Sequence, residues 1–441
     1  MRLEKKEKYL KEVEAPFTAI TAMEEATRCL LCHDAPCSKG CPAGTDPGKF
    51  IRSIRFRNFK GAAETIRENN ILGGVCARVC PYDKTCEEAC SRTGIDKPIE
   101  IGRLQRFATD FEKATGFKVL DPVEATKEKV AIVGAGPAGL AVAAKLALKG
   151  YAVTIFEEKP EAGGVLTYGI VPSRLPQEVV NDEVQYIKDL GVNFVFNCKV
   201  GKDVTVDELK EQGFQAFFLG IGMQLPKVLD IPGSDLEGVT NAVEFLGTAK
   251  PSKGEVQVGQ HVIVIGGGDV AMDSATTAKE LGNRVTVLYR RSMLEMPANR
   301  KELKHVQDIG VHFIPEFNMI EILGENGKVC AVKGLGRDGE STIELKADMV
   351  IFSIGQEAEA VTEIADIAIN DKKLVVVDEN TCKTNVDGFF AAGDIVNGGK
   401  TVVEAVAAGK AAAEGIDQYL TALREMKATG AEVAVEKEGV K

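Results

Sequence analysis

Hydrophobic residues follow a helical spacing in the first quarter of the chain. In Lys49–Phe56 and again in Ala62–Ile66, apolar positions recur every three or four residues, which is typical of an amphipathic helix. We expect residues 1–120 to form a helical domain in which these two runs make one helical stretch. Residues 116–129 contain Pro122 and several charges, so we expect them to be a linker.

Beyond the linker, short runs of mostly apolar residues alternate with longer helix-like stretches. The runs are Lys129–Val133, Ala152–Phe156, His261–Ile265 and Arg284–Leu288. Short runs rich in Val and Ile predict buried strands, and helices between them predict the parallel sheets of an α/β fold.

A glycine-rich turn follows the first strand and precedes a helix rich in Ala and Leu. Its glycines permit a tight turn, the approach of a pyrophosphate to the backbone, and close packing of helix on strand. The helix N-terminus offers N–H donors to phosphates, and an acid at the end of the second strand can accept ribose hydroxyls. The residues of this predicted dinucleotide site are Gly134, Gly136, Pro137, Ala138, Gly139 and Glu157.

The same strand–turn–helix–strand order recurs at residues 261–288, but its last strand ends differently. Where the first unit has Glu157, the second has Arg290 and Arg291. Arginine can bind a 2′-phosphate with two parallel hydrogen bonds, whereas a carboxylate would repel it. We therefore expect NADP(H) rather than NAD(H) here; the alternative is that both arginines are solvated surface charge. The turn residues of this second dinucleotide unit are Gly266, Gly268, Asp269 and Val270.

Charge and composition narrow the class of protein. The net charge of −11 argues against a nucleic-acid partner, and no apolar run approaches the roughly 20 residues that cross a bilayer. The charged start, Met1–Lys6, is not followed by the apolar stretch of a signal peptide. We expect a cytoplasmic enzyme of about three domains.

Eight of the 11 cysteines lie in two groups before residue 91. The spacing is C-x2-C-x4-C-x3-C-P in the first group and C-x3-C-P-x4-C-x3-C in the second. Thiolates a few residues apart, with Pro directly after Cys, are typical of [4Fe–4S] sites. Zinc, the alternative, prefers paired C-x-x-C knuckles, and only Cys29 and Cys32 form one. Disulfides would require an oxidising compartment.

An iron–sulfur front, an FAD fold and an inserted NAD(P) fold, in this order, resemble one family of electron-input flavoproteins over nearly the whole chain. The family includes the small subunit of glutamate synthase, the amino-terminal half of dihydropyrimidine dehydrogenase and the large subunit of electron-bifurcating transhydrogenases. The chain looks most similar to the electron-input subunit of bacterial dihydropyrimidine dehydrogenase. The segments that carry this resemblance are Arg28–Cys37, Phe56–Ile66 and Ile101–Gln105.

The resemblance implies a ligand set for each of two [4Fe–4S] clusters. In both sets, ligands from the two cysteine groups are combined, which would make iron binding part of folding. A glutamine ligand should alter the charge and potential of its cluster. Cys76 would be a packed neighbour rather than a ligand. The implied sets are Cys29, Cys32, Cys37 and Cys90 for one cluster, and Cys41, Cys80, Cys86 and the side-chain oxygen of Gln105 for the other.

The resemblance also implies residues that bind the flavin and the nicotinamide. A strand that ends in Gly393-Asp394 would bring a carboxylate to the ribityl–pyrophosphate region, and the helix after Thr401 would direct its N-terminus at the isoalloxazine. Asp269 and Val270 match a loop on the nicotinamide side. Further matching positions near the cofactors are Gly163, Gly164, Leu166, Arg174 and Gly355.

The order of these motifs implies that the chain is divided into four parts. Residues 1–120 would be the helical iron–sulfur domain, and residues 126–250 with 356–421 would be a discontinuous FAD-binding domain. Residues 251–355 would be the inserted NAD(P)-binding domain, with 348–355 as the return strand. Residues 422–441 would be a loosely held tail.

The function that the resemblance implies is oxidation of NAD(P)H, with electrons passed through FAD and two clusters to a partner subunit. That partner would carry an FMN barrel where uracil or thymine is reduced to the 5,6-dihydropyrimidine. Alternatives are the NADPH-oxidising small subunit of glutamate synthase, a disulfide reductase, which would need a C-x-x-C pair beside the flavin, and a non-catalytic flavin-bearing subunit. No catalytic residue for a pyrimidine is expected, because His261, His305 and His312 occur singly.

Overall fold

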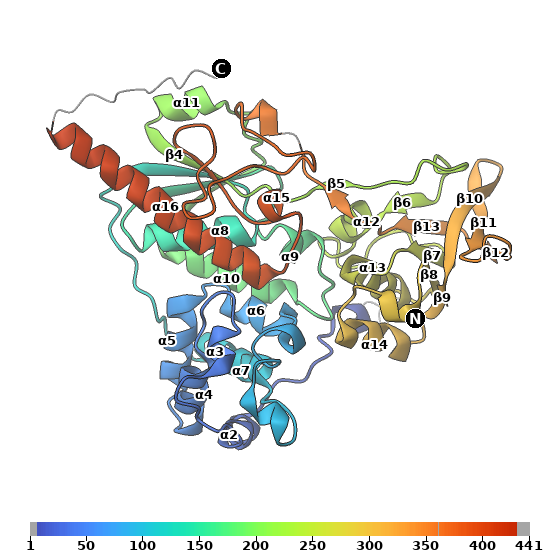
Figure 1. Ribbon diagram of the computed structural model, residues 1–441, viewed down its shortest axis with the longest axis horizontal. Helices are drawn as coiled ribbons and strands as arrows, with labels where there is room; N and C mark the ends of the chain where they lie inside the picture. Colours follow the sequence, from blue (N-terminus) through green and yellow to red (C-terminus); the bar gives the residue numbers. More distant parts are fainter. Residues whose placement is uncertain (1–6, 360, 430–441) are drawn as a thin grey trace.

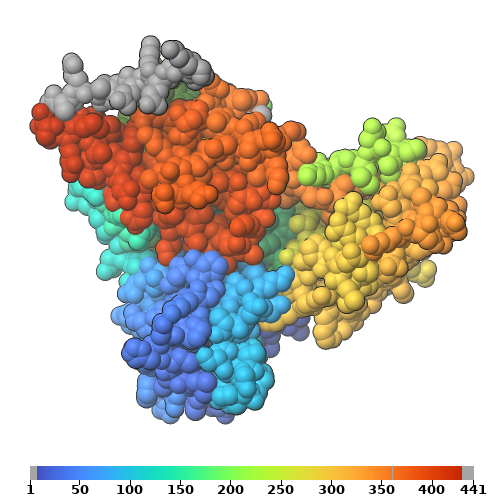
Figure 2. All heavy atoms as spheres, in the orientation of Figure 1, coloured from blue at the N-terminus to red at the C-terminus, as the bar shows by residue number. Residues whose placement is uncertain are grey.

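The two strand–turn–helix units form two separate parallel sheets, and the cysteine-rich front forms a helical lobe beside them. The computed structural model describes residues 7–359 and 361–429. Figure 1 and Figure 2 show these three parts as three lobes, with the helical front lobe below the other two. The predicted α/β class with a helical front is confirmed.

Short helices build the front lobe around the two cysteine groups. The predicted single helical stretch over residues 49–66 is wrong, because Arg57 has a φ of 62° and interrupts it. The Asn58 side chain then accepts a hydrogen bond from the Gly61 N–H at 2.9 Å and caps a new helix. The helices described in this lobe are α2 (Ala19–Thr27), α3 (Pro36–Lys39), α4 (Pro47–Arg55), α5 (Phe59–Asn69), α6 (Gly73–Val79) and α7 (Ile101–Thr115).

The first sheet is parallel and has the strand order β15-β4-β1-β2-β3. Its central strand pairs in register with the next strand along the chain, Val130 with Val153 and Ile132 with Ile155. Helix α16 crosses this lobe, and its N-terminal end points toward the centre of the molecule (Figure 1). The strands are β1 (Lys129–Val133), β2 (Ala152–Glu157), β3 (Asn193–Phe196), β4 (Phe214–Leu219) and β15 (Phe389–Ala391). The helices are α8 (Pro137–Ala147), α9 (Val165–Tyr168), α10 (Gln177–Asp189), α11 (Val206–Glu211), α15 (Asp394–Asn397) and α16 (Val402–Thr429).

The second sheet is also parallel, with the order β6-β13-β7-β8-β9, and an antiparallel sheet β10-β11-β12 accompanies it. Its strands are β6 (Val239–Asn241), β7 (His261–Ile265), β8 (Arg284–Tyr289), β9 (His312–Pro315) and β13 (Met349–Phe352), and the antiparallel strands are β10 (Phe317–Glu325), β11 (Lys328–Gly336) and β12 (Thr342–Lys346). The helices are α12 (Ala242–Ala249), α13 (Asp269–Glu280) and α14 (Arg300–Asp308).

The inserted lobe begins earlier than the predicted boundary at residue 250. Strand β6 belongs to the second sheet, and a two-stranded link, β5 (Leu225–Pro226) with β14 (Gln356–Glu357), lies where the chain passes between the two lobes. The predicted return strand is β13, which pairs with β6 and β7 in the second sheet. The strand that returns to the first sheet is β15, which lies beside β4. A short run at 239–241 carries too weak a pattern to be assigned to either sheet from sequence.

The predicted tail at 422–441 is helical in the part that the structure describes. Helix α16 continues to Thr429, and Arg424 forms an ion pair with Glu128 at 3.2 Å. Residues 430–441 lie outside the described residues. Leu423 also packs against the hydrophobic core of the first sheet's lobe, so side chains beyond residue 421 anchor the helix past the expected boundary.

The front lobe and the lobe of the first sheet share one hydrophobic core. Leu72 and Val75 of the front lobe are fully buried in the same cluster as Leu140 and Ile187. Arg67 donates within the front lobe to Glu112 on α7 and across this interface to Glu183 on α10, each at 2.7 Å, and all three side chains are buried. The two lobes are therefore held together as one unit.

No helix within residues 7–359 and 361–429 combines the length and the apolar composition that crossing a membrane requires.

Replacing Arg67 by leucine should destabilise the protein by about 3–5 kcal/mol, because two carboxylates would stay buried without a counter-charge. Urea unfolding of the cofactor-loaded protein, followed by flavin fluorescence, measures this. The control is Lys60→Ala, which removes the exposed pair with Glu64 and should cost less than about 1 kcal/mol. Equal losses in the two variants would contradict the role of the buried triad.

Candidate functional site

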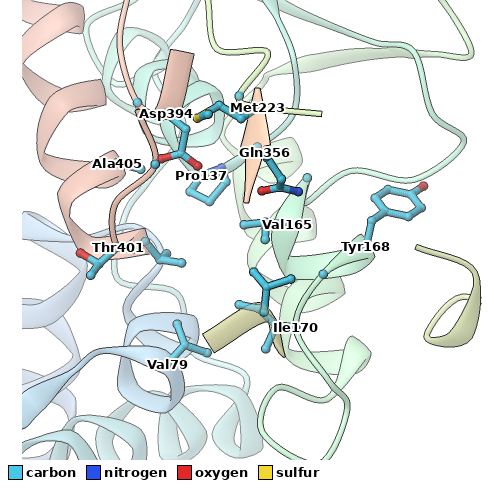
Figure 3. Close-up of a pocket in the computed structure, with 18 of the residues that line it drawn as sticks. Val79, Pro137, Val165, Tyr168, Ile170, Met223, Gln356, Asp394, Thr401 and Ala405 are labelled. Carbon is cyan, nitrogen blue, oxygen red and sulfur yellow. The ribbon is translucent and has the colours of Figure 1, made fainter. Parts of the chain in front are cut away.

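A cavity of about 930 Å³ lies where the three lobes meet. Its walls include both glycine-rich turns, the segment 79–82 of the front lobe, and the first turn of α16. Figure 3 shows Val79 of the front lobe around the same space as Ile170 and Thr401 of the first-sheet lobe, hereafter the flavin-type lobe. The cavity is therefore continuous across parts of the chain that are far apart in sequence.

The first glycine-rich turn leaves a bare stretch of backbone on the cavity wall. A Cβ on Gly139 would lie 2.1 Å from the carbonyl oxygen of Gly134, so this glycine is required for packing α8 on β1. At Gly136 the nearest atom, the oxygen of Gly220, would be 3.8 Å from such a Cβ. No protein atom packs closely against Gly136, so its backbone is open to a ligand. Helix α8 begins directly after it. This arrangement fits a pyrophosphate at a helix N-terminus.

Glu157 ends β2 with its carboxylate held in place on the cavity wall. Its Oε2 accepts the N–H of Ala135 at 2.8 Å and its Oε1 accepts the N–H of Lys159 at 2.9 Å. Burial raises the pKa of this carboxyl, and the two N–H donors oppose that rise. A carboxylate has about four lone-pair sites, so Glu157 can still accept two ribose hydroxyls.

The C-terminal segment closes the cavity from the opposite side. Gly393 has a φ of 80° and precedes Asp394, whose Oδ1 accepts the Lys400 N–H at 3.1 Å. Burial raises the pKa of Asp394. Thr401 and Glu404 cap the start of α16, since the Thr401 hydroxyl donates to the Glu404 carboxylate at 2.7 Å. The N-terminus of α16 therefore faces the cavity, as Figure 3 shows for Thr401 and Ala405.

The structure places the three residues of segment 163–166 that we expected near the flavin in two different positions. Gly164 lies on the cavity wall, and a Cβ there would lie 2.9 Å from the Cα of Gly136. Gly163 and Leu166 lie behind the wall: Leu166 is fully buried, and its carbonyl accepts a hydrogen bond from Lys250 at 2.6 Å. These two residues support the wall and do not form it.

The second glycine-rich turn contributes the other wall. Gly266 has a φ of 142°, and a Cβ there would lie 2.2 Å from the oxygen of Ser353. Gly268 has no atom within 4 Å of its Cβ position and is open to the cavity. Asp269 accepts the Asn299 N–H at 2.7 Å, which fixes the start of α13. Asp269, Val270 and Gly355 also line the cavity.

Arg290 and Arg291 follow β8 at the carboxyl edge of the second sheet. Both side chains are exposed, and neither belongs to the cavity lining. The Arg291 carbonyl accepts the Glu316 N–H at 3.0 Å, which anchors its backbone. The two guanidinium groups lie at the sheet edge where the adenosine end of a bound dinucleotide would end.

Arg174 lines the cavity, but its charge is engaged by the second-sheet lobe. It forms ion pairs with Asp273 at 2.8 Å and Glu302 at 3.4 Å. Burial raises the pKa of Asp273 to about 7 and lowers that of Lys250 to about 7. These residues form a charged contact between the lobes that sequence analysis missed, because its members belong to different domains and no motif connects them.

The front lobe also touches the second-sheet lobe directly beside the cavity. The Asn299 side chain donates to Asp83 at 3.2 Å, and the Lys301 ammonium lies 5.1 Å from the centre of the Tyr82 ring. Asn299 and Lys301 line the cavity, as does Tyr82. The contact is again polar, in contrast to the apolar core between the front lobe and the first sheet.

Four cysteines surround a small cavity in the front lobe. Cys29, Cys32, Cys37 and Cys90 line it together with apolar residues of α3 and α4. Burial, together with the neighbouring Cys90 and Cys29 thiols, raises the pKa of the Cys37 thiol to about 11. The structure thus brings together the four residues of the first implied ligand set. Within the described residues, no three His, Cys, Asp or Glu side chains are placed to hold a single metal ion.

The other four front cysteines, Cys41, Cys76, Cys80 and Cys86, lie close together between the front lobe and the flavin-type lobe. Contact with the Cys76 thiol and burial raise the pKa of the Cys80 thiol. The nearby Cys86 and Cys41 thiols contribute to the same rise. Burial, the Glu87 carboxylate and Cys41 raise the pKa of Cys86 to about 12. Cys80 also lines the large cavity. The cysteines of the second implied set therefore lie together and adjoin the cavity.

Gln105 and Cys76 are both buried near this second group. Gln105 lies on α7 and donates its side-chain N–H to the Gly73 oxygen at 2.8 Å. This bond fixes the orientation of the amide and leaves its oxygen free of that contact. Cys76 is 1% exposed and packs in the core shared by two lobes, and its thiol contacts that of Cys80.

Comparison with protein families gives two matches that together cover most of the chain. Residues 5–117 match the model described as dihydropyrimidine dehydrogenase domain II, 4Fe–4S cluster. Residues 128–409 match the pyridine nucleotide-disulphide oxidoreductase model. The predicted order of a [4Fe–4S] domain before a flavin and nicotinamide reductase is confirmed, and zinc is set aside in favour of iron–sulfur clusters.

Individual relatives agree with these matches. The chain is 47% identical over 413 residues, 93% of this chain and 97% of the other, to the NAD-dependent dihydropyrimidine dehydrogenase subunit PreT of Salmonella typhimurium. It is 37% identical to the NADP(+)-dependent formate dehydrogenase subunit beta of Moorella thermoacetica, over 88% of this chain and 60% of that one. The fold is similar to that of Mycobacterium tuberculosis FprA in complex with NADPH, with a TM-score of 0.57, 22% identity, and coverage of 70% of this chain and 87% of that chain.

Changing Gly268 to alanine should leave bound FAD and iron unchanged and weaken NAD(P)H binding at least about tenfold. The added methyl group meets no protein atom, so it projects only into the space of the cofactor. The matched variant is Gly136→Ala, which should lose FAD instead. Flavin and iron content with NAD(P)H titration measure both; loss of FAD in Gly268→Ala would contradict the division of the cavity.

Proposed function

The chain belongs to the family of the NAD-dependent dihydropyrimidine dehydrogenase subunit PreT, and we propose that it is the electron-input subunit of a dihydropyrimidine dehydrogenase. It is an NAD(P)-dependent flavin and iron–sulfur oxidoreductase. In the proposed reaction, NAD(P)H is oxidised here and a partner subunit reduces uracil or thymine to the 5,6-dihydropyrimidine.

One observation carries this proposal: both glycine-rich turns and Cys80 line the same cavity. Bound FAD would accept a hydride from NAD(P)H and release electrons singly to the clusters, which is chemistry that the cofactors supply. The chain holds both dinucleotides against one space. It also places a cysteine of the second ligand set on the wall of that space.

We assign the cavity residues to FAD and to NAD(P)H by the turn to which they belong. The first turn holds the FAD pyrophosphate, Glu157 holds a ribose, and Asp394 and the start of α16 hold the flavin end. For FAD the assigned residues are Gly134, Gly136, Pro137, Ala138, Gly139, Glu157, Gly164, Leu166, Arg174, Gly393, Asp394 and Thr401, with Leu166 acting from behind the wall. For NAD(P)H they are Gly266, Gly268, Asp269, Val270, Gly355, Arg290 and Arg291.

We assign the cluster ligands as the resemblance implies, and the grouping of the thiols supports it. Cys29, Cys32, Cys37 and Cys90 enclose one space, whereas Cys41, Cys80 and Cys86 lie together at the flavin side with Gln105 buried nearby. Because Cys80 adjoins the cavity, the cluster of Cys41, Cys80 and Cys86 is the one placed to receive electrons first. The other cluster lies farther toward the surface of the front lobe.

The proposed partner is a subunit with an FMN barrel and further clusters, to which the front lobe delivers electrons. The relatives named above are subunits of larger dehydrogenases, which supports a hetero-oligomer. The alternative of a glutamate synthase small subunit would require a large glutamine-using partner instead. A disulfide reductase would need a C-x-x-C pair beside the flavin, and the cysteines after Cys90 are the isolated Cys198, Cys330 and Cys382.

Combining the holoprotein with an FMN-barrel subunit should produce NAD(P)H-dependent reduction of uracil, measured as dihydrouracil. The holoprotein alone should reduce an artificial acceptor but not uracil.

Cys80→Ala should keep NAD(P)H-dependent flavin bleaching and lose at least 90% of uracil reduction, because the first relay cluster is lost. The control is Cys330→Ala, which lies on β11, far from both cysteine groups in sequence.

A holoprotein that oxidises no NAD(P)H with any acceptor would instead support the non-catalytic subunit. Glutamate formation with a glutamine-using partner, in place of uracil reduction, would support the glutamate synthase alternative.

Changing Arg290 and Arg291 together to glutamine should raise the KM for NADPH at least about tenfold and change that for NADH little. The reason is that only NADPH carries the 2′-phosphate that two guanidinium groups can bind. The ratio of kcat/KM for the two nucleotides also decides which is the better substrate; the Salmonella typhimurium relative is named NAD-dependent. The control is Arg284→Gln at the opposite end of β8. Equal losses for both nucleotides would contradict the 2′-phosphate assignment.

A further inference from the structure

Lys410 on α16 reaches out of the flavin-type lobe and binds two carbonyls of the front lobe. Its Nζ donates to the oxygen of Ala43 and to the oxygen of Asn69, both at 2.7 Å. Ala43 comes two residues after Cys41, and Asn69 is the last residue of α5. No motif in the sequence singles out this lysine.

The helix that carries Lys410 is also the helix that begins at the cavity. Ala405 lines the cavity, and Lys410 lies five residues farther along, which is about 7.5 Å at 1.5 Å per residue. Between them, a Cβ on Gly409 would lie 2.6 Å from the oxygen of Ala138 in the first glycine-rich turn. Gly409 thus lets α16 lie directly against the start of α8. The position of the ammonium is therefore fixed relative to both the flavin turn and the Cys41 loop.

The positive charge of Lys410 is not taken up by a neighbouring carboxylate. Glu414, one turn farther along α16, pairs with Lys149 at 2.6 Å and with Lys145 at 3.7 Å. Among the described residues, Lys410 has no carboxylate at ion-pair distance. Burial lowers the pKa of Lys410, and the Lys145 charge lowers it further, whereas Cys41 and Glu414 raise it. The charge of Lys410 is thus directed at the Cys41 loop.

We propose that Lys410 is a positioning residue whose ammonium raises the reduction potential of the cluster held by Cys41, Cys80 and Cys86. Reduction adds one electron and makes a cluster more negative, so a fixed positive charge close by stabilises the reduced form. The effect is selective, because the Cys29, Cys32, Cys37 and Cys90 group lies in a separate cavity in the front lobe. This inference rests on the cluster assignment proposed above.

The test is a redox titration of the anaerobically prepared holoprotein, with the two clusters followed separately by EPR. In Lys410→Gln, which keeps an N–H donor for the carbonyls but removes the charge, the ratio of reduced to oxidised cluster at a fixed potential should fall about tenfold for one cluster. A tenfold change corresponds to 59 mV for a one-electron couple. The second cluster should be unchanged, and Lys410→Arg should match the wild type.

Lys145→Gln is the matched control, since it removes a positive charge from the same neighbourhood without a contact to the Cys41 loop, and it should shift neither cluster as far. Unchanged potentials in a Lys410→Gln protein with full iron content would overturn the proposal. So would equal shifts of both clusters, or a Lys410→Gln protein that loses one cluster while Lys410→Arg retains it, which would make the lysine a tether only. A wild-type holoprotein whose iron and labile-sulfide content falls short of two [4Fe–4S] clusters would overturn the cluster assignment itself.

Discussion

The apolar core shared by the front lobe and the first-sheet lobe is the constraint on which the rest of the structure depends. Electron transfer between bound groups falls off steeply with distance, so a relay requires a separation that does not fluctuate. Leu72 and Val75 supply buried surface to the core of the flavin-type lobe, and Arg67 pairs with Glu183 across the same interface. This interface fixes Cys80 on the wall of the cavity.

The second-sheet lobe is attached in a different way. It joins the rest through the two-stranded link of β5 and β14 and through polar contacts, among them Arg174 with Asp273 and Asn299 with Asp83. Two buried side chains from outside this lobe, Tyr9 and Val171, also pack against it. Polar interfaces between domains permit relative motion more readily than apolar ones. In the proposed assignment, the flavin and the clusters thus lie on two lobes that share one apolar core, whereas the nicotinamide lobe is joined to them by a more polar interface. That division suits a subunit in which one substrate must enter and leave while the electron path stays fixed.

Sequence predicted those parts of the fold that depend on local patterns. The strands at 129–133 and 261–265, their glycine turns and the grouping of the cysteines all follow from short-range spacing. Breaks and boundaries set by single backbone angles or by distant partners were missed: Arg57 splits the expected helix because of its positive φ, and β6 joins a sheet whose other strands come later in the chain. Lys250, Asp273 and Lys410 were missed for the same reason, since their partners belong to other lobes.

The central claim is that nicotinamide, flavin and clusters form one path through this chain. Rapid mixing of anaerobic holoprotein with NAD(P)H, followed by freeze-quench EPR and absorbance, tests it most directly. The account predicts flavin bleaching first and cluster EPR signals afterwards, within the time of one turnover and with no partner present. Flavin that is reduced while both clusters stay oxidised long after flavin reduction is complete, or clusters that are reduced by NAD(P)H in protein lacking FAD, would contradict it.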